Sequence, residues 1–451
     1  MSSRSALSPE RLIDRERAAF AASRPRSQAL AQRSARHFLQ GVPMHWMADW
    51  GTPFPLFVAR AAGSTLTDVD DQQYADFCLG DTGAMFGHSP AAISRALAGQ
   101  ADRGLTCMLP TPEVAAIGER LAARFSLPAW QVTQTATDAN RAVLRWARAI
   151  TGRPRILVFQ GCYHGTVDET MVRLRAGRTV AREGAIGPAF ASEHAALAVE
   201  FNDEVALAAA LARGDIAAVI AEPVMTNIGM VLPQPGFLDR LRELTRRHDV
   251  LLVLDETHTL SSGPAGYAGG LDWKPDFWVC GKAIAGGVPC AVYGFTAEVA
   301  ERIEALLAGR APGHSGMGTT LAANALAMAA LDAALNELHT ESTHLAMQTR
   351  AVELERGLRQ IFAARDLAWH VSRVGARLEF GFGQAPINGS EAEAAMRPAL
   401  EHALHLWLLN RGLLVTPFHN MMLTAPMLPA SAVDQLLAAT AEFLDVVDLE
   451  C

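Results

Sequence analysis

The chain has 451 residues, half of them hydrophobic and 19% charged, which excludes a disordered protein and allows a large buried core. The formal net charge of −8 argues against a nucleic-acid-binding protein, and no apolar run approaches the roughly 18 residues needed to cross a membrane. Six cysteines without a CxxC pair indicate neither a zinc site nor a disulfide framework, so we expect a cytoplasmic enzyme.

The first segment, residues 1–40, predicts a peripheral helical arm. Ser8-Pro9-Glu10 is typical of a helix start, because serine caps helices and proline is tolerated in the first turn. Arginine and serine are frequent here, as in a transit peptide, but Asp14 and Glu16 disfavour that alternative.

Residues 41–89 are expected to form the N-terminal part of a small domain. Residues 54–77 alternate like short antiparallel strands, with turns at Gly63 and at Asp70-Asp71.

Residues 90–325 predict a large α/β domain. Short apolar runs without alternation are typical of strands buried on both faces of a parallel sheet. Residues 237–247 separate two of them and carry apolar side chains at helical spacing, which gives a βαβ unit. Ligands bind at the carboxyl ends of strands in such sheets. The runs are 156–160, 217–222, 251–255 and 276–280, and the polar residues at their ends are Gln160, Glu222, Asp255 and Lys282.

Residues 326–451 predict the C-terminal α+β part of the small domain. The last helix is expected to open at Ser431, in a relative of the capping box. The motif EHALH, residues 401–405, is interpreted as a solvated helix face. The other expected elements are an alanine-rich helix at about 321–338, a charged helix at 344–361, and strands near 376–382 and 413–416.

Lysine is scarce in this chain. Of 39 basic residues only Lys274 and Lys282 are lysines, a bias that arginine-rich codon usage explains. Under that pressure lysine should survive mainly where arginine cannot replace it, because only lysine can lose its proton and act as an amine nucleophile. Lys274 precedes Pro275 in an expected surface loop, whereas Lys282 follows an apolar run. Lys282 is therefore the candidate for a Schiff base.

Other motifs complement Lys282. Asp255 ends a buried strand, where a carboxylate could cap the strand, act as a base, bind a metal or pair with a protonated ring nitrogen; no His, Asp and Glu cluster supports a metal. An imine-forming lysine and a carboxylate on a pyridinium nitrogen are the minimum for pyridoxal phosphate. Residues 135–140 offer a phosphate cradle at the start of a helix expected at 138–150, and Tyr163 offers a ring for stacking.

In this order, the motifs resemble those of the class III aminotransferases, especially glutamate-1-semialdehyde aminomutases and β-amino-acid transaminases, from about Phe54 to the C-terminus. The resemblance implies an α/β fold-type I structure, with a large mostly parallel sheet domain and a smaller α+β domain built from both termini. It also implies pyridoxal 5′-phosphate as the cofactor and a homodimer with active sites at the interface.

The resemblance also implies roles for residues in matched motifs. TATDAN matches the family's SGTEAN, so Thr135, Ala136 and Thr137 are expected at the phosphate. DETHT matches DEVMT and GKAIAGGVP matches GK-x-x-GGG-x-P, which places Asp255 on the ring nitrogen and Lys282 in the Schiff base. Further expected cofactor contacts are Tyr163 and His164 of GCYHG, Glu222, Asn227, His258, Thr319 and Thr320, with Thr320 reaching the phosphate of a neighbouring subunit.

Two departures from the family pattern bear on function. His258 is either a satisfied core histidine or a residue that tunes the protonation of the cofactor. The substrate arginines of β-amino-acid transaminases have no counterpart in the matching segments, which hold His45, Trp46, Trp50, Phe418 and His419 instead. If these five face the cleft, they favour a hydrophobic amine or a substrate whose carboxylate is distant or masked. Alternatively, the aromatic residues pack the N-terminal segment onto the body.

The resemblance implies transamination of an amine or amino acid, with the amino group passed to a keto-acid or aldehyde acceptor. An aminomutase, which returns the amine to another carbon of the same substrate, is the main alternative. A racemase or epimerase and a non-catalytic pyridoxal-binding protein are disfavoured. No G-x-G-x-x-G follows a strand, which disfavours a nicotinamide dehydrogenase.

Overall fold

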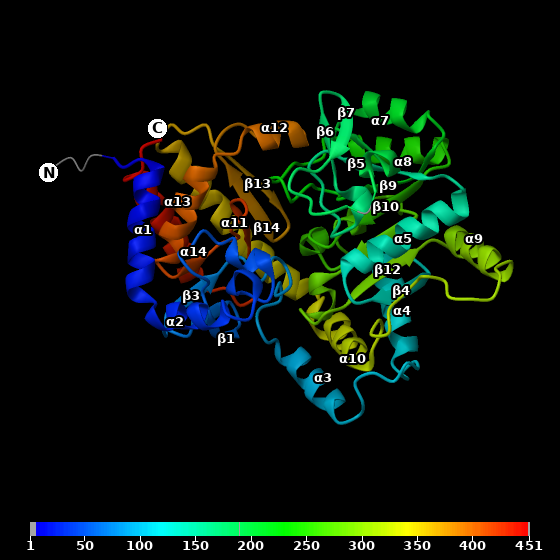
Figure 1. Cartoon of the computed structure of the whole chain (residues 1–451), viewed down its shortest axis with the longest axis horizontal. Coiled ribbons are helices and arrows are strands. Elements are labelled where there is room, and N and C mark those ends of the chain that lie inside the picture. Colours follow the sequence, from blue (N-terminus) through cyan, green and yellow to red (C-terminus); the bar gives the residue numbers. More distant parts are fainter. Residues whose placement is uncertain (1–5, 189, 450–451) are drawn as a thin grey trace.

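In the computed structural model, which describes residues 6–188 and 190–449, a seven-stranded sheet forms the centre of the larger of two lobes (Figure 1). β12 runs antiparallel to the other six strands, which are parallel to one another, so the sheet is mostly parallel, as predicted. In spatial order the strands are β4 (Ala129–Thr133), β12 (Ala291–Phe295), β11 (Phe277–Cys280), β10 (Leu251–Asp255), β9 (Ile216–Ala221), β5 (Arg155–Phe159) and β8 (Ala196–Val199).

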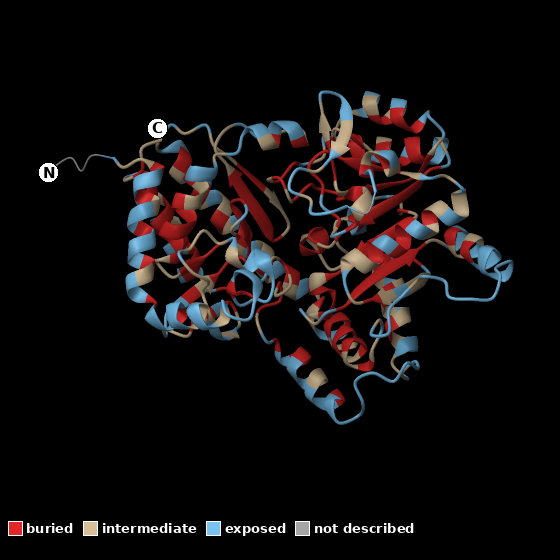
Figure 2. Cartoon of the chain, viewed as in Figure 1, coloured by how far each residue is buried: buried red, intermediate tan, exposed pale blue. Residues whose placement is uncertain are grey.

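Helices cover both faces of this sheet. Leu252 and Leu254 of β10 belong to the hydrophobic cluster that includes α8 (Phe237–Arg247), whereas Leu251 and Val253 belong to the cluster that includes α5 (Ala136–Thr151). Burial on both faces explains the absence of alternation in the sequence, and Figure 2 shows these strands as buried. The other elements of this lobe are α3 (Ala91–Ala101), α4 (Val114–Phe125), α6 (Ser192–Ala195), α7 (Glu204–Leu211), α9 (Ala297–Ala308), α10 (Ala325–Ala333), β6 (Val172–Arg175) and β7 (Arg178–Ala181).

The two ends of the chain build the smaller lobe. The predicted antiparallel strands have turns at Gly63 and Asp71, both with positive φ, and a strand from the C-terminal part joins them in parallel. Both described ends lie on this lobe in Figure 1. Its elements are β1 (Val58–Ala62), β2 (Thr65–Asp68), β3 (Gln73–Asp76), β13 (His370–Val374), β14 (Arg377–Gly381), β15 (Leu413–Leu414), β16 (Met421–Leu423), α1 (Pro9–Ser23), α2 (Pro25–Ser34), α11 (Glu341–Ala363), α12 (Gly389–Ala394), α13 (Pro398–Leu409) and α14 (Ala430–Leu444).

Helix boundaries confirm some expectations and correct others. Ser8 caps α1 by accepting a hydrogen bond from the Arg11 backbone N–H, as predicted. The capping role expected of Ser431 is wrong, because Pro429 is the N-cap of α14 and no side chain caps it. The alanine-rich helix expected to continue to about residue 338 changes to a π-helical turn after α10, over Ala334–Leu338.

The expectation of a solvated face at residues 401–405 is also wrong. This segment lies in α13, which contacts both α1 and α14. His405 is buried and its Nε2 lies 3.1 Å from Oδ1 of Asn420. Burial lowers the pKa of His405 to about 4, so the side chain is neutral near pH 7. The sequence of α13 conceals this, because the residue that covers His405 is Asn420, in the segment between β15 and β16.

Within the described ranges, no helix is long and apolar enough to cross a membrane, and no group of three or more His, Cys, Asp or Glu side chains could hold a metal ion. The five cysteines of the described part of the chain are free thiols, and Cys451 lies outside it.

Candidate active site

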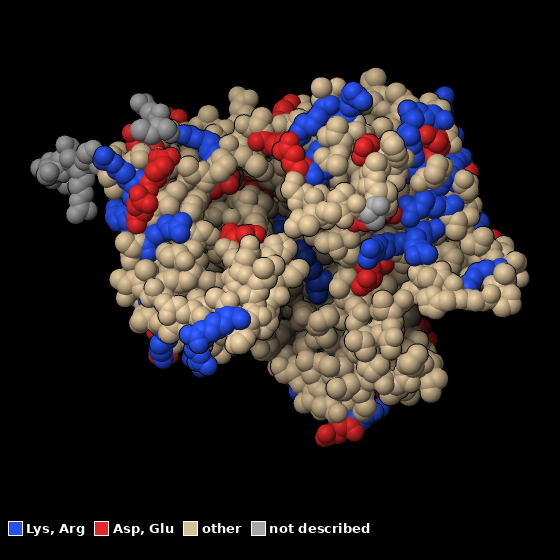
Figure 3. Space-filling view, in the orientation of Figure 1, with Lys and Arg blue, Asp and Glu red and all other residues tan. Residues whose placement is uncertain are grey.

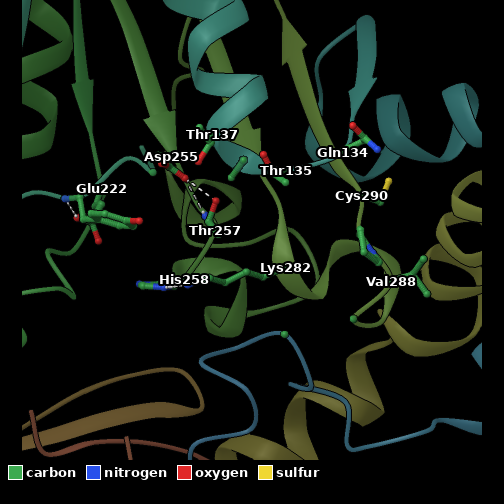
Figure 4. A pocket seen from close by; sticks show the side chains of 16 residues that line it. Gln134, Thr135, Thr137, Glu222, Asp255, Thr257, His258, Lys282, Val288 and Cys290 are labelled. Carbon is green, nitrogen blue, oxygen red and sulfur yellow. Dashed lines mark hydrogen bonds between the residues drawn. The ribbon is translucent and has the colours of Figure 1, made fainter. Parts of the chain in front are cut away.

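A cavity of about 410 Å³ lies at the carboxyl ends of the central strands (Figure 4). This volume is in the range typical of small-molecule sites. The surface is hollowed between the two lobes (Figure 3). The predicted site residues that line the cavity are Thr135, Ala136, Thr137, Tyr163, Glu222, Asp255, His258 and Lys282.

The start of α5, where the sequence predicts an anion cradle, lies at the cavity wall. Thr135 is the N-cap, and its hydroxyl accepts a hydrogen bond from the Asp138 backbone N–H at 3.2 Å. The N–H groups of Ala136 and Thr137 have no acceptor within the helix and are available to a phosphate. Ala136 does not have positive φ, so its methyl group is tolerated where the family has glycine. A Cβ at Gly165 would lie 2.1 Å from Thr137 Oγ1, which explains the glycine there.

Asp255 is a buried, ionised carboxylate at the cavity wall. Its Oδ2 lies 3.0 Å from His164 Nδ1 and accepts a hydrogen bond from Asn140 Nδ2 at 2.8 Å; its Oδ1 accepts one from Thr257 Oγ1 at 2.7 Å. Burial opposes the charge, but these hydrogen bonds and the charge of His164 prevail and lower the pKa of Asp255 to about 2. Burial also opposes the imidazolium, yet Cys162 and Asp255 raise the pKa of His164 to about 10. Asp255 can therefore hold a protonated ring nitrogen.

Lys282 ends a hydrogen-bonded chain that crosses the cavity wall. Its Nζ donates to Asp81 Oδ2 at 2.7 Å and to His258 Nε2. His258 Nδ1 lies 2.6 Å from the Thr226 hydroxyl, which donates to Glu222 Oε2 at 2.6 Å. Because Thr226 donates to Glu222, it accepts from the Nδ1–H of His258, which leaves Nε2 free to accept from the lysine. Burial and the charge of Lys282 lower the pKa of His258 to about 4, so the ring is neutral. His258 thus contacts the candidate reactive lysine, and Figure 4 shows the two side by side.

Two expected cofactor contacts support the cavity from outside it. His164 is 1% exposed and lies behind Asp255. Asn227 donates through Nδ2 to Glu222 Oε2 at 3.3 Å. Neither side chain lines the cavity, so each can act on it only through the carboxylate that it contacts. Burial raises the pKa of Glu222.

Thr319 and Thr320 also lie outside this cavity. Both are exposed, and Thr319 Oγ1 donates to Gln134 Oε1 at 3.0 Å. Within one chain, Thr320 therefore has no part in the cradle formed by α5.

The five expected substrate residues do not gather around Lys282, and none lines the cavity. His45 and Trp46 are exposed, Trp50 packs against the cluster that contains Phe20, and Phe418 is half exposed. His419 is buried, with Nδ1 2.8 Å from Glu379 Oε1. For Trp50 the alternative interpretation therefore holds, in which an aromatic residue packs the N-terminal segment onto the body.

Asp81, which contacts Lys282 from the loop after β3, carries no recognisable signal in the sequence. An aspartate between glycine and threonine reads as an ordinary turn. The same holds for Arg377 of β14, a fully buried cation whose Nη2 donates to the Thr82 hydroxyl. The contacts of Asp81 and Arg377 can be recognised only once the smaller lobe is packed against the larger one.

Comparison with known proteins gives consistent results. The profile of the family described as aminotransferase class-III matches residues 46–446. A glutamate-1-semialdehyde 2,1-aminomutase of Sorangium cellulosum is 35% identical over 405 residues, which is 87% of this chain and 90% of that protein. The structure resembles a glutamate-1-semialdehyde-aminomutase from Pseudomonas aeruginosa (50% identity, 97% of this chain and 98% of that one, TM-score 0.95), of which a variant has been solved in complex with PMP. It also resembles a β-phenylalanine aminotransferase from Variovorax paradoxus (28% identity, 97% of each chain, TM-score 0.86).

Proposed function

The chain belongs to the class-III aminotransferase family, and we propose that it transfers an amino group from an amine or amino acid to a keto-acid or aldehyde acceptor, with Lys282 as the reactive amine. The chain is an enzyme of this class with pyridoxal 5′-phosphate as its cofactor. One observation carries the proposal. Asp255 ends β10 and Lys282 follows β11, these two strands are adjacent and parallel, and both residues line the same cavity.

The residues around the cavity fit this cofactor. The free N–H groups at the start of α5, with Thr135 and Thr137, suit its phosphate. The ionised Asp255 suits its ring nitrogen, and Tyr163 offers a ring face at the cavity wall. When bound, the cofactor supplies an electron sink for the carbon that bears the substrate amine.

The protein groups supply the proton chemistry. Lys282 has a primary amine that can attack a carbonyl and, once free, can carry a proton between two neighbouring carbon atoms. Asp255 keeps the proton on the ring nitrogen, because its own pKa lies far below neutrality. The neutral His258 accepts a hydrogen bond from Lys282 and fixes the direction of its side chain.

The five cysteines of the described part of the chain are free thiols, which supports a reducing compartment, the cytoplasm, as the site of action.

An aminomutase is the second candidate, and the names of the relatives favour it. The Sorangium and Pseudomonas proteins both carry the name of glutamate-1-semialdehyde aminomutase. An aminomutase uses the same cofactor, cradle and lysine, but returns the amino group to its substrate.

Dependence on an acceptor separates the two candidates. With a transaminase, turnover of the amino donor should stop after one equivalent per active site unless pyruvate, 2-oxoglutarate or an aldehyde is added. The measurement is product formation by purified holoenzyme across a panel of amines, amino acids and glutamate-1-semialdehyde, each with and without acceptor. Multiple turnovers of glutamate-1-semialdehyde without acceptor would contradict transamination and establish the aminomutase.

We further propose that the active form is a homodimer in which Thr320 acts on the partner's site. This explains why an exposed threonine of a matching motif lies away from its own cavity. Lys282→Ala and Thr320→Asp should each be inactive alone, the latter because a carboxylate repels phosphate. After subunit exchange, each mixed dimer has one site free of both substitutions, so the mixture should recover activity. No recovery despite exchange, followed by native mass spectrometry, would reject the shared site.

A further inference from the structure

The amine of Lys282 has a carboxylate partner that comes from the other lobe. Asp81 lies in the loop after β3, and its Oδ2 accepts a hydrogen bond from Lys282 Nζ at 2.7 Å. The Asp81 side chain is 39% exposed, so solvent reaches it within the site. On its other side, Nζ contacts Nε2 of His258. The amine is therefore held between one anionic and one neutral acceptor.

The loop that presents Asp81 adopts a strained backbone. Leu79, Gly80, Asp81 and Thr82 are four consecutive residues with positive φ, at 48°, 57°, 48° and 81°. Of these only glycine adopts such a conformation freely, and a β-branched threonine there is a genuine outlier. Strain of this kind persists only where the surrounding structure enforces it, and it concentrates at functional sites.

The smaller lobe enforces this conformation. Asp76 Oδ1 accepts hydrogen bonds from the backbone N–H groups of Cys78 and Leu79, both at 2.8 Å. Arg377, 1% exposed, donates through Nη2 to the hydroxyl of Thr82, while its Nε and Nη1 have no partner among the described residues. A buried guanidinium directed at the residue next to Asp81 braces the loop and favours the anionic form of that aspartate.

The charges around the pair are consistent with an ion pair. Burial raises the pKa of Asp81, but the charges of Lys282 and Arg377 outweigh it and hold that pKa well below its usual value. Asp81 is therefore ionised at neutral pH. The other titratable groups that act on Asp81 or Lys282 are Tyr163, His419, Cys78 and Cys280.

We propose that Asp81 is a positioning residue that holds the free amine of Lys282 in an ion pair and so slows the attack of this amine on the aldehyde of the cofactor. The inference rests on the proposed function, because it takes Lys282 as the reactive amine. Arg377 and Thr82 serve it by fixing the loop.

The test measures how fast the apoprotein captures pyridoxal phosphate, and it uses the scarcity of lysine. In a Lys274→Arg background Lys282 is the only lysine, so the absorbance of the lysine–cofactor linkage reports one site. Only the neutral amine attacks the aldehyde, so the ion pair with Asp81 should slow capture. In Asp81→Asn the capture rate should rise, because an opposite charge in contact with the amine is removed. Capture at pH 7 should then be about tenfold faster or more.

The direction of this change separates the proposal from damage to the fold. A disturbed site captures the cofactor more slowly, and that result, or a capture rate identical to that of the parent, overturns the proposal. Asp81→Glu keeps the carboxylate and should move the capture rate back toward that of the parent. Asp71→Asn is the matched control: it makes the same change at another aspartate with positive φ, 82% exposed and paired with Arg26, and should leave the capture rate unchanged.

A lysine-free variant tests the premise separately. Lys282→Ala combined with Lys274→Arg should form no lysine–cofactor linkage. If this variant shows the linkage absorbance, the proposed function of Lys282 fails. If it does not, and Asp81→Asn behaves as its parent, only the role of Asp81 is rejected.

Discussion

Lys282→Arg is expected to abolish covalent attachment of the cofactor and to lower kcat by about 10²–10⁴-fold or more, the range of a lost acid–base group. Arginine keeps a positive charge beside Asp81 and His258, so the fold should persist. The guanidinium does not lose its proton in proteins, however, and cannot attack an aldehyde. The measurement is the absorbance of the holoprotein, followed by borohydride reduction and mass spectrometry of the protein.

Lys274→Arg is the matched control for this experiment. Lys274 precedes the amino end of β11, whereas Lys282 follows its carboxyl end, at the cavity. Lys274→Arg should therefore keep both the attached cofactor mass and the activity. Attachment of the cofactor in Lys282→Arg, or its loss in Lys274→Arg, would move the reactive lysine to residue 274.

Asp255→Asn is expected to give the second largest effect, a fall in kcat of about 10²–10³-fold, as for the loss of one preorganised electrostatic group. An amide cannot hold the proton on the ring nitrogen as a carboxylate does. The absorbance of the cofactor should change while its attachment to Lys282 remains. Near wild-type turnover would show that Asp255 only caps β10.

Glu256→Gln controls for the burial of a carboxylate in the same segment. Glu256 is fully buried and accepts hydrogen bonds from the Ala268 backbone N–H and from Trp278 Nε1, at 2.8 and 2.9 Å, outside the cavity. Its substitution should reduce stability and leave kcat unchanged. A comparable fall in kcat in both variants would attribute the effect of Asp255→Asn to the fold.

The stability of Asp255→Asn should also depend on pH in a defined way. The folded-state pKa of Asp255 is about 2, against 3.8 for the unfolded chain, so its ionisation contributes about 2 kcal/mol to the stability of the wild type. Because the folded pKa is depressed, this contribution is present above about pH 4 and is lost as the pH falls toward about 2. Chemical unfolding at several pH values should show the difference between the two proteins shrinking over that interval.

Local sequence patterns predict the central sheet and the residues along its carboxyl edge. Residues 251–255 form β10 as predicted, and residues 237–247 form α8, because a strand buried on both faces and an amphipathic helix each leave a local periodic pattern. The scarcity of lysine singled out Lys282, since only one chemical property distinguishes lysine from arginine in such a chain. Thr135, Asp255 and Lys282 line one cavity because parallel strands bring their carboxyl ends together.

Contacts between the lobes depend on how the two lobes pack and leave no local pattern in the sequence. Asp81 and Lys282 are far apart in sequence, and neither the strained loop after β3 nor Arg377 of β14 has a local pattern that distinguishes it from an ordinary turn or an ordinary strand. His405 likewise looks like a surface residue until neighbouring elements cover it. The physical reason is that periodicity reports which face of an element is buried, whereas the partner of a charged group depends on how separate elements pack against each other.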